Sequence, residues 1–199
     1  MPKTNKLTKI VNFLYEVGTL RKIPRGHMQA LLTNDLSDNI ASHSYRVAII
    51  GWFLAKEEKA DPYKVLLMCL FHDIPETRSG DQNWIHKKYV KVFENEIIND
   101  QYKNLANEKE LLELTKEYHN RKTPEAKLAK AADLLDQIML LKEYERQGNI
   151  EASSWLKGSQ QEKKINQLVN SVFANKLAKE ILKQKPHNWW QNIWTADRR

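Results

Sequence analysis

The stretch CLFHDIPETRSGD, residues 69–81, carries an apolar helix into a loop that holds five ionisable side chains. Residues 65–68 before it are all apolar, and charge is costly to bury beside such a segment. His72 and Asp73 stand about 100° apart around a helix axis, so near the helix end both side chains can lean toward one point. A metal ion there would offset the desolvation of the carboxylate and would explain polar residues on a core helix.

The rest of the chain follows helical periodicity, and the sequence predicts an all-α fold. Asp61 is suited to the N-cap and Pro62 to the first turn of the apolar helix that ends at the His-Asp pair. Neither strand-like alternation nor a fixed-period repeat is found in the sequence. Further helices are expected over residues 7–17, 42–58, 86–106, 108–119, 124–147 and 160–184, with a basic connection over 19–39 and an aromatic tail after 184.

Composition indicates a folded protein that works in a reducing compartment. The chain has 199 residues, of which 41% are hydrophobic and 29% charged, a balance that excludes a disordered chain. No run of roughly 18 apolar residues could span a membrane, and the first residues lack the apolar segment of a secretory signal. The single cysteine, Cys69, cannot form an internal disulfide. These features predict a cytoplasmic protein without a membrane partner.

The net charge favours an anionic partner. Lys and Arg number 32 against 25 Asp and Glu, which gives a formal charge of +7, so nucleotides, nucleic acids and acidic surfaces would all be attracted. The basic residues are scattered among Glu and apolar residues, in segments such as HKKYVK and QEKKINQ. That scatter is typical of a solvated helical surface and argues against a nucleic-acid partner.

Two residues on other apolar helices complete a candidate metal set with the His-Asp pair. His43 lies at the start of the helix expected over 42–58, and Asp133 lies inside a later helix, where Asp is a poor helix former. With His72 and Asp73 they supply two imidazoles and two carboxylates, a set suited to Mn, Fe, Co, Ni or Zn that lacks the thiolates of a structural zinc site. Four protein ligands on a six-coordinate ion leave room for water and substrate.

The same residues also have structural interpretations. His43 could be a core histidine that is hydrogen-bonded to a backbone carbonyl. Asp133 could form a helix salt bridge with Lys130 or Lys127, which would contribute only ~0.3–0.5 kcal/mol if exposed. In the aromatic tail, packing or self-association of Trp189, Trp190 and Trp194 is favoured over stacking on a base.

The order of these residues, His43, then His72-Asp73, then Asp133, resembles the HD-domain metal-dependent phosphohydrolases. More narrowly, HSYRVA (43–48), FHDIPETRSGD (71–81) and EAKLAKAADLLDQ (125–137) are similar to the branch that contains bacterial 5′-deoxynucleotidase and its eukaryotic HD-domain-containing relatives. The resemblance covers about residues 7–147. It implies a single HD-domain helical bundle over residues 1–199, with an additional C-terminal helix and the aromatic tail in an extension of about 150–199.

The resemblance also implies an activity and the residues that carry it. The activity is removal of phosphate from (deoxy)nucleoside 5′-monophosphates with one divalent metal ion, and members of the family are often dimers. Glu76, at the HD-x-x-E position, would orient or deprotonate the attacking water, and Asp81 would act in substrate recognition. The implied metal ligands are His43, His72, Asp73 and Asp133.

Three basic residues are candidates for the substrate phosphate. The segment LRKIPRG, residues 20–26, resembles the Arg-x-Pro segment from which these enzymes reach phosphate. Here Lys22 stands in the place of the Arg and Arg25 follows the proline, so either could bind phosphate. Lys130 fits the family's K-x-x-D and could face the phosphate or support the ligands. Ser42 stands where relatives carry an acidic residue, and it is interpreted as a helix cap.

Other functions remain open at this point. Nucleoside triphosphate triphosphohydrolase and cyclic-nucleotide phosphodiesterase activities use similar HD chemistry. A nucleotide-binding protein without turnover belongs to a different class. The intact Glu76 and the complete ligand set argue against that last alternative.

Overall fold

The computed structural model describes residues 5–158, 168, 171–191 and 193. Within these residues the chain forms helices and no strand, with one isolated bridge between Pro24 and Asn39, so the predicted all-α class is confirmed. The elements are α1 (Lys6–Val17), η1 (Gly18–Lys22), α2 (Met28–Leu31), α3 (Ile40–Glu57), α4 (Pro62–Phe71), α5 (Glu76–Ser79), α6 (Trp84–Tyr89), α7 (Glu94–Tyr102), α8 (Glu108–Asn120), α9 (Pro124–Arg146), α10 (Ile150–Lys157), α12 (Val172–Lys183) and η2 (Asn188–Trp190).

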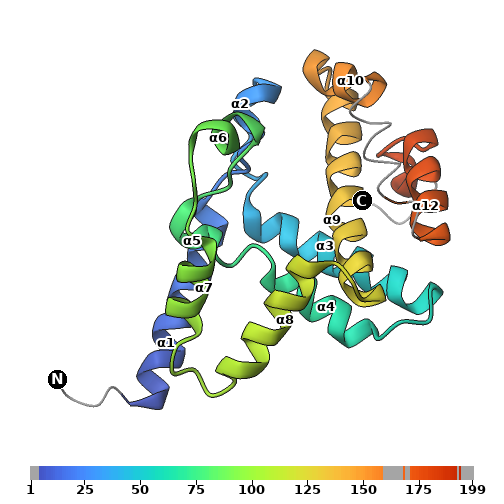
Figure 1. The fold of residues 1–199 in the computed structure, drawn as a ribbon. Helices are drawn as coiled ribbons and strands as arrows, with labels where there is room; N and C mark the ends of the chain where they lie inside the picture. Colours follow the sequence, from blue (N-terminus) through green and yellow to red (C-terminus); the bar gives the residue numbers. More distant parts are fainter. Residues whose placement is uncertain (1–4, 159–167, 169–170, 192, 194–199) are drawn as a thin grey trace, which may run out of the picture.

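Helices α3, α4 and α9 form the centre of the molecule, and α8 and α12 pack around them (Figure 1). Val47 and Leu54 of α3, Val65 of α4, and Leu135 and Ile138 of α9 are fully buried in one core cluster. Each such side chain stabilises the fold by about 1.5–3 kcal/mol relative to exposure. Polar groups carried by these three helices are therefore held in fixed positions by the core.

The close packing of α3 on α4 depends on a glycine. A Cβ atom added at Gly51 would lie 2.6 Å from Cys69 Sγ and 3.0 Å from a methyl carbon of Val65. The Cys69 thiol is free and buried, and burial raises its pKa well above the ordinary value. The cysteine therefore serves packing between the two helices.

Most helix starts follow the sequence signals. Asp61 accepts hydrogen bonds from two backbone N–H groups of α4, at 2.9 and 3.2 Å, and Thr123 caps α9 in the same way. The interpretation of Ser42 as a cap is wrong, because Asn39 caps α3 and accepts a hydrogen bond from the Ser42 N–H at 3.1 Å. Ser42 lies inside the first turn, where its hydroxyl donates to the Ser37 carbonyl at 2.8 Å.

Two predicted segments differ from the structure. Residues 86–106 do not form one helix, because α6 ends at Tyr89 and α7 begins at Glu94. No residue of α6 is buried, so no apolar face stabilises a helix through this segment. The expected connection over 19–39 contains the short helices η1 and α2.

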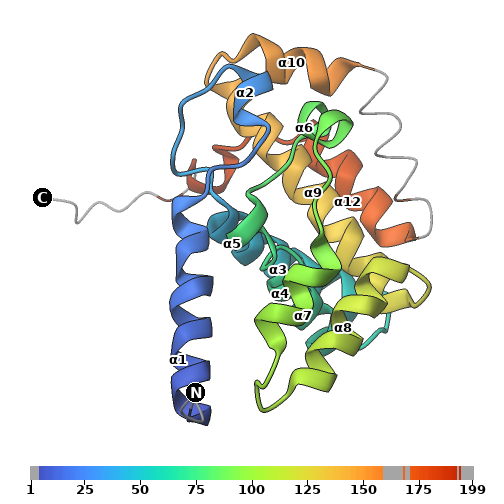
Figure 2. The same cartoon turned by 60° about the vertical axis from the view of Figure 1, so that its left-hand side comes forward.

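The C-terminal part contains α10, which was not predicted, and α12, which overlaps the helix expected over 160–184. Residues 160–167 and 169–170 of that prediction lie outside the described residues, as does Trp194. Ala174 and Ala178 of α12 belong to the main core, and the helix runs beside α9 in Figures 1 and 2. Trp189 and Trp190 are exposed. In the described part of the chain, no helix is both long and apolar enough to cross a membrane.

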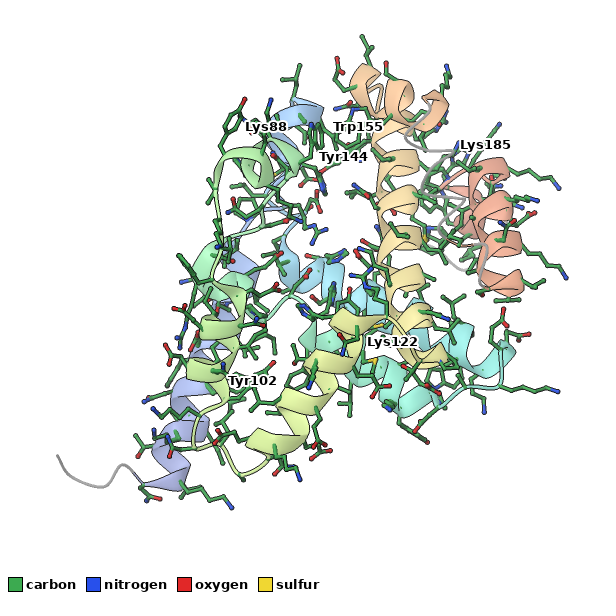
Figure 3. The ribbon with its side chains drawn as sticks, viewed as in Figure 1. Lys88, Tyr102, Lys122, Tyr144, Trp155 and Lys185 are labelled. Atoms are coloured by element: carbon green, nitrogen blue, oxygen red, sulfur yellow. The ribbon has the colours of Figure 1, made fainter. Side chains whose placement is uncertain are left out.

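A second, smaller core joins α10 to the N-terminal part of the chain. It contains Leu31 of α2, Leu141 and Tyr144 of α9, and Ala152 of α10. Asn149, the N-cap of α10, donates a hydrogen bond to the Leu31 carbonyl at 2.7 Å across 118 residues of sequence. Figure 3 shows Tyr144 and Trp155 at this end of the molecule, where α9 and α10 face α2 and α6. The Trp155 ring lies edge-on to Trp84 of α6, with ring centroids 4.9 Å apart.

Candidate metal centre

Three of the predicted ligands converge at the centre of the bundle. His43 of α3, His72 at the end of α4, and Asp73 each offer one ligand atom, and these atoms all lie within 4.8 Å of one another. Asp73 Oδ2 is 3.1 Å from His72 Nε2 and 3.4 Å from His43 Nε2. Both histidines are buried, and among the described residues neither Nε2 atom has a hydrogen-bond partner. Buried imidazole nitrogens without a partner beside a carboxylate fit a divalent cation.

Asp133 lies next to this group, but it is not one of the three residues whose ligand atoms all lie within 4.8 Å of one another. Its Oδ1 is 3.4 Å from His43 Nε2, while its Oδ2 is bonded to Lys130 one turn earlier on α9. The helix salt bridge considered from the sequence therefore forms, and Asp133 faces the histidine as well. Burial raises the pKa of Asp133, but Lys130 and His43 lower it more, so the pKa lies well below its ordinary value. The carboxylate is charged and available to a cation.

The second ring nitrogen of each histidine is also fixed. His72 Nδ1 lies 2.8 Å from the Cys69 carbonyl, and His43 Nδ1 lies 2.6 Å from Asp136 Oδ2. The structural alternative for His43, a hydrogen bond to a backbone carbonyl, is thus wrong. His72 is the histidine that makes such a bond. Burial and the charge of Arg25 lower the pKa of His43, but the carboxylates of Asp133 and Asp136 outweigh them and raise this pKa to about 9.

Asp136 is a residue that the sequence reasoning missed. It follows Asp133 by three positions on α9, so both carboxylates lie on one face of the helix. That spacing was the available signal. It is also typical of an ordinary solvated helix face, and only the packing of α3 on α9 distinguishes the two.

Glu76 begins α5, directly behind the ligand pair. Its Oε2 atom is buried and has no hydrogen-bond partner among the described residues. Burial and the charges of Asp73 and Asp81 raise the pKa of Glu76 to about 10. The carboxyl group thus holds a proton readily in a part of the site that is rich in negative charge.

Of the two basic candidates in the 20–26 segment, the structure brings Arg25 to the site. Its Nη1 is 3.2 Å from Asp73 Oδ2, and its Nε is 3.3 Å from Asp81 Oδ2. Burial lowers the pKa of Arg25, but Asp81 and Asp73 raise it more, so the guanidinium stays charged. Lys22 is exposed at the end of η1. Lys130 is partly exposed on α9 and reaches the site through its contact with Asp133.

The loop that carries Arg25 is bound to the loop that carries Asp81. The Gly26 N–H donates to Asp81 Oδ2 at 2.8 Å, and the Asn83 side chain donates to the Gly26 carbonyl at 2.7 Å. A Cβ atom at Gly26 would lie 2.5 Å from the Asp81 carbonyl oxygen, so only glycine allows this approach. His27, next along, lies 2.7 Å from the buried carboxylate of Asp38, whose backbone carbonyl accepts from the Arg25 N–H.

Comparison with known proteins agrees with this geometry. A family model described as HD domain matches residues 17–176. The chain is 33% identical over 125 residues to the 5′-deoxynucleotidase HDDC2 of Dictyostelium discoideum, covering 57% of this chain and 66% of that protein. It is 28% identical over 142 residues to the 5′-deoxynucleotidase HDDC2 of Homo sapiens, covering 68% of each. The matched part thus spans about two thirds of the length of these relatives.

Solved structures have the same fold. A conserved hypothetical protein from Pyrococcus furiosus matches with a TM-score of 0.68 and 26% identity, covering 87% of this chain and 96% of that one. The family match extends from the end of α1 into α12 and includes all the helices that carry the histidines and carboxylates described above. The chain belongs to the HD domain family, the metal-dependent phosphohydrolases that its motifs resemble.

Proposed function

We propose that this protein is a metal-dependent 5′-nucleotidase that removes phosphate from (deoxy)nucleoside 5′-monophosphates. The observation that carries the proposal is the convergence of His43, His72 and Asp73 beside the buried Glu76 carboxyl and the Arg25 guanidinium. A cation site, a proton-accepting group and a fixed positive charge are the parts that phosphate-ester hydrolysis needs. The 5′-deoxynucleotidase relatives favour a nucleoside monophosphate as the substrate.

One divalent ion is proposed, held by His43, His72 and Asp73 with Asp133 as the fourth ligand. The donor set of two imidazoles and two carboxylates suits Mn, Fe, Co, Ni or Zn. When bound, such an ion supplies positive charge for the phosphoryl oxygens and lowers the pKa of a water ligand. Lys130 would hold the Asp133 carboxylate in place from the other side.

Glu76 is proposed as the group that accepts the proton of the attacking water. Its side chain lies in a low-dielectric region beside Asp73 and Asp81, and their charges raise its proton affinity. A cation held by Asp73 would offset one of those two charges, which would lower the pKa of Glu76 and make it available as a base. Turnover then depends on Glu76, whereas the ligand set for the metal does not include it.

Arg25, rather than Lys22, is proposed to bind the substrate phosphate. A guanidinium offers several N–H donors in a plane and suits phosphoryl oxygens. Asp81 would act in substrate recognition through this residue, because its Oδ2 orients the Arg25 side chain and receives the Gly26 N–H.

A single domain over residues 1–199, acting in the cytoplasm, is part of the proposal. The packing of α12 in the main core supports one domain, and the free buried thiol of Cys69 suits a reducing compartment. Limited proteolysis and cell fractionation test these two statements.

A homodimer is also proposed, through the faces of α3 and α4 that point away from α9. These helices expose apolar side chains at helical spacing, which is typical of an interaction surface. Light scattering across a range of protein concentrations tests the dimer. The exposed side chains are Tyr45, Ile49 and Phe53 of α3 and Tyr63, Leu67 and Leu70 of α4.

The test of the activity is product release from a panel of phosphate esters. We expect orthophosphate from nucleoside 5′-monophosphates, loss of activity with a chelator, and recovery when a divalent ion is added back. Glu76→Gln should reduce turnover by about 10²–10⁴-fold while metal and nucleotide remain bound. Triphosphate released from a nucleoside triphosphate, or a linear product from a cyclic nucleotide, would favour the other HD activities. Nucleotide binding without turnover of any ester would identify a binding protein.

A further inference from the structure

Asp136 lies outside the proposed ligand set and yet makes the closest polar contact that His43 has among the described residues. Its Oδ2 is 2.6 Å from His43 Nδ1, the ring nitrogen that faces away from Asp73 and Asp133. The Asp136 residue is only 3% exposed. A buried carboxylate needs partners that repay its desolvation, and the imidazole is one of them.

The other oxygen of this carboxylate is occupied as well. Arg46 Nε donates to Asp136 Oδ1, and Arg46 Nη1 donates to Glu143 Oε1 at 2.6 Å. His43 and Arg46 are three residues apart on α3, while Asp136 and Glu143 are seven apart on α9, so each pair shares one helix face. Asp136 is therefore held between His43 and Arg46, and Arg46 is held in turn by Glu143, so the Asp136 carboxylate cannot rotate freely.

This arrangement determines which nitrogen of His43 faces the cation site. An imidazole that ligates a cation is neutral and carries one N–H, and the hydrogen bond made by its other nitrogen decides where that proton stays. An anionic acceptor at Nδ1 keeps the proton there and leaves the Nε2 lone pair toward Asp73 and Asp133. Such a contact also makes the ligating nitrogen more basic.

His72 provides an internal comparison. Its Nδ1 donates to the backbone carbonyl of Cys69 at 2.8 Å, which fixes the ring without a charge. Of the two histidines, His43 alone has a carboxylate on Nδ1 among the described contacts. Metal affinity should therefore depend more on the Nδ1 contact of His43 than on that of His72.

We propose that Asp136 is a positioning residue for metal binding, held by Arg46, which fixes the ring of His43 with Nε2 directed to the cation. The inference rests on the metal site of the proposed function, but not on the identity of the substrate. Metal affinity measured without any nucleotide therefore tests it separately from the phosphatase activity.

The experiment is calorimetric titration of metal-free protein with Zn²⁺ alone. Asp136→Asn keeps the size of the side chain and removes its charge, and we expect Zn²⁺ affinity to fall by about 10–100-fold. Arg46→Gln leaves the carboxylate but frees it to rotate, and a smaller loss of about 2–10-fold is expected. Circular dichroism must show that each variant is folded. If Asp136→Asn does not fold, Arg46→Gln decides the question.

The chain offers a matched control in Asp38→Asn. Asp38 is a second buried carboxylate that lies 2.7 Å from a histidine, His27, but that histidine is not in the ligand group. This variant should lose stability and keep Zn²⁺ affinity within about twofold. An equal loss of affinity in Asp38→Asn and Asp136→Asn would show that general destabilisation is the cause, and would overturn the proposal.

A spectroscopic measurement separates positioning from a merely structural role. In the zinc-loaded protein, the Nδ1 proton of His43 should resonate far downfield because its acceptor is a carboxylate. In Asp136→Asn that resonance should move upfield, while the Nδ1 proton of His72 stays unchanged. Unchanged His43 resonance together with unchanged Zn²⁺ affinity would overturn the assignment of Asp136.

Discussion

The two halves of the site are built in different ways. The metal half consists of side chains on or at the ends of α3, α4 and α9, and these helices are buried against one another in the main core. The proposed phosphate half consists of Arg25 and Asp81, which lie on loops that are joined by hydrogen bonds to Gly26 and Asn83. Packing spread over many side chains fixes the first half, whereas a few polar contacts fix the second.

The two halves should differ in how well they tolerate change. A large apolar core resists a local perturbation, so the ligand positions should survive single substitutions at the surface. Loops held by a few hydrogen bonds open at lower free energy, so the phosphate half can adapt to different substrates.

The largest effect is expected in the metal half. Asp133→Ala should remove bound metal and reduce activity by about 10³-fold or more, since charge stabilisation at the phosphoryl group depends on the ion. Metal analysis of the purified variant and a phosphate-release assay measure the two losses together. A variant that kept stoichiometric metal and full activity would exclude Asp133 from the ligand set.

A smaller effect is expected in the phosphate half. Arg25→Gln should lower kcat/KM by about 10²-fold, because one charge-assisted contact to the phosphate is lost, while metal content stays unchanged. Lys22→Gln is the matched control, since Lys22 is exposed, and its kinetic constants should stay close to those of the unmodified protein. A larger loss of kcat/KM in Lys22→Gln than in Arg25→Gln would mean that Lys22 binds the phosphate.

The smallest effect is expected on stability, from Glu16, whose side chain is hydrogen-bonded to α5. Glu16 of α1 accepts hydrogen bonds from Arg78, Gln101 and Thr77, and these contacts hold its pKa below the ordinary value of 4.5, against the effect of burial. Because the pKa is lower in the folded state, Glu16 stabilises the protein above the unfolded-state pKa, and this contribution is lost as the pH falls through the folded pKa.

Since the Arg78 and Glu16 side chains are partly exposed, the stabilisation is no more than about 1 kcal/mol. Urea unfolding at neutral pH should show Glu16→Gln to be less stable than the unmodified protein by that amount. The difference should shrink as the pH falls through the folded-state pKa of Glu16, which lies below 4.5. A difference that did not depend on pH would mean that the Glu16 charge is not involved.

The sequence predicted the fold and the metal half more fully than the phosphate half, for physical reasons. Helical periodicity and caps such as Asp61 and Thr123 are local signals, so they located α4 and α9 correctly. The candidate ligands His43, His72 and Asp73 then lie on helices whose apolar faces must meet, and the structure brings them together. Their role as ligands stays a prediction until metal is measured.

The remaining features depend on contacts between distant segments. Lys22 and Arg25 could not be distinguished from the sequence. The close approach of Gly26 to the Asp81 loop decides that Arg25 is the one in contact with the carboxylates of Asp73 and Asp81. The role of Asp136 depends on the crossing of α3 over α9, which no local pattern specifies. The break between α6 and α7 was missed because apolar residues there remain on the surface.

The bond between Asn149 and the Leu31 carbonyl has a consequence for any shortened version of the protein. It ties the beginning of the C-terminal extension to α2, only a few residues beyond Arg25. Trimming the chain just after Arg146 would therefore remove a brace from the segment that presents the guanidinium, although the cut lies more than one hundred residues away in sequence. Because the same cut removes α12 from the main core, Asn149→Ala, which breaks only this bond, isolates the effect, and this variant should still bind its cation and yet hydrolyse phosphate esters slowly.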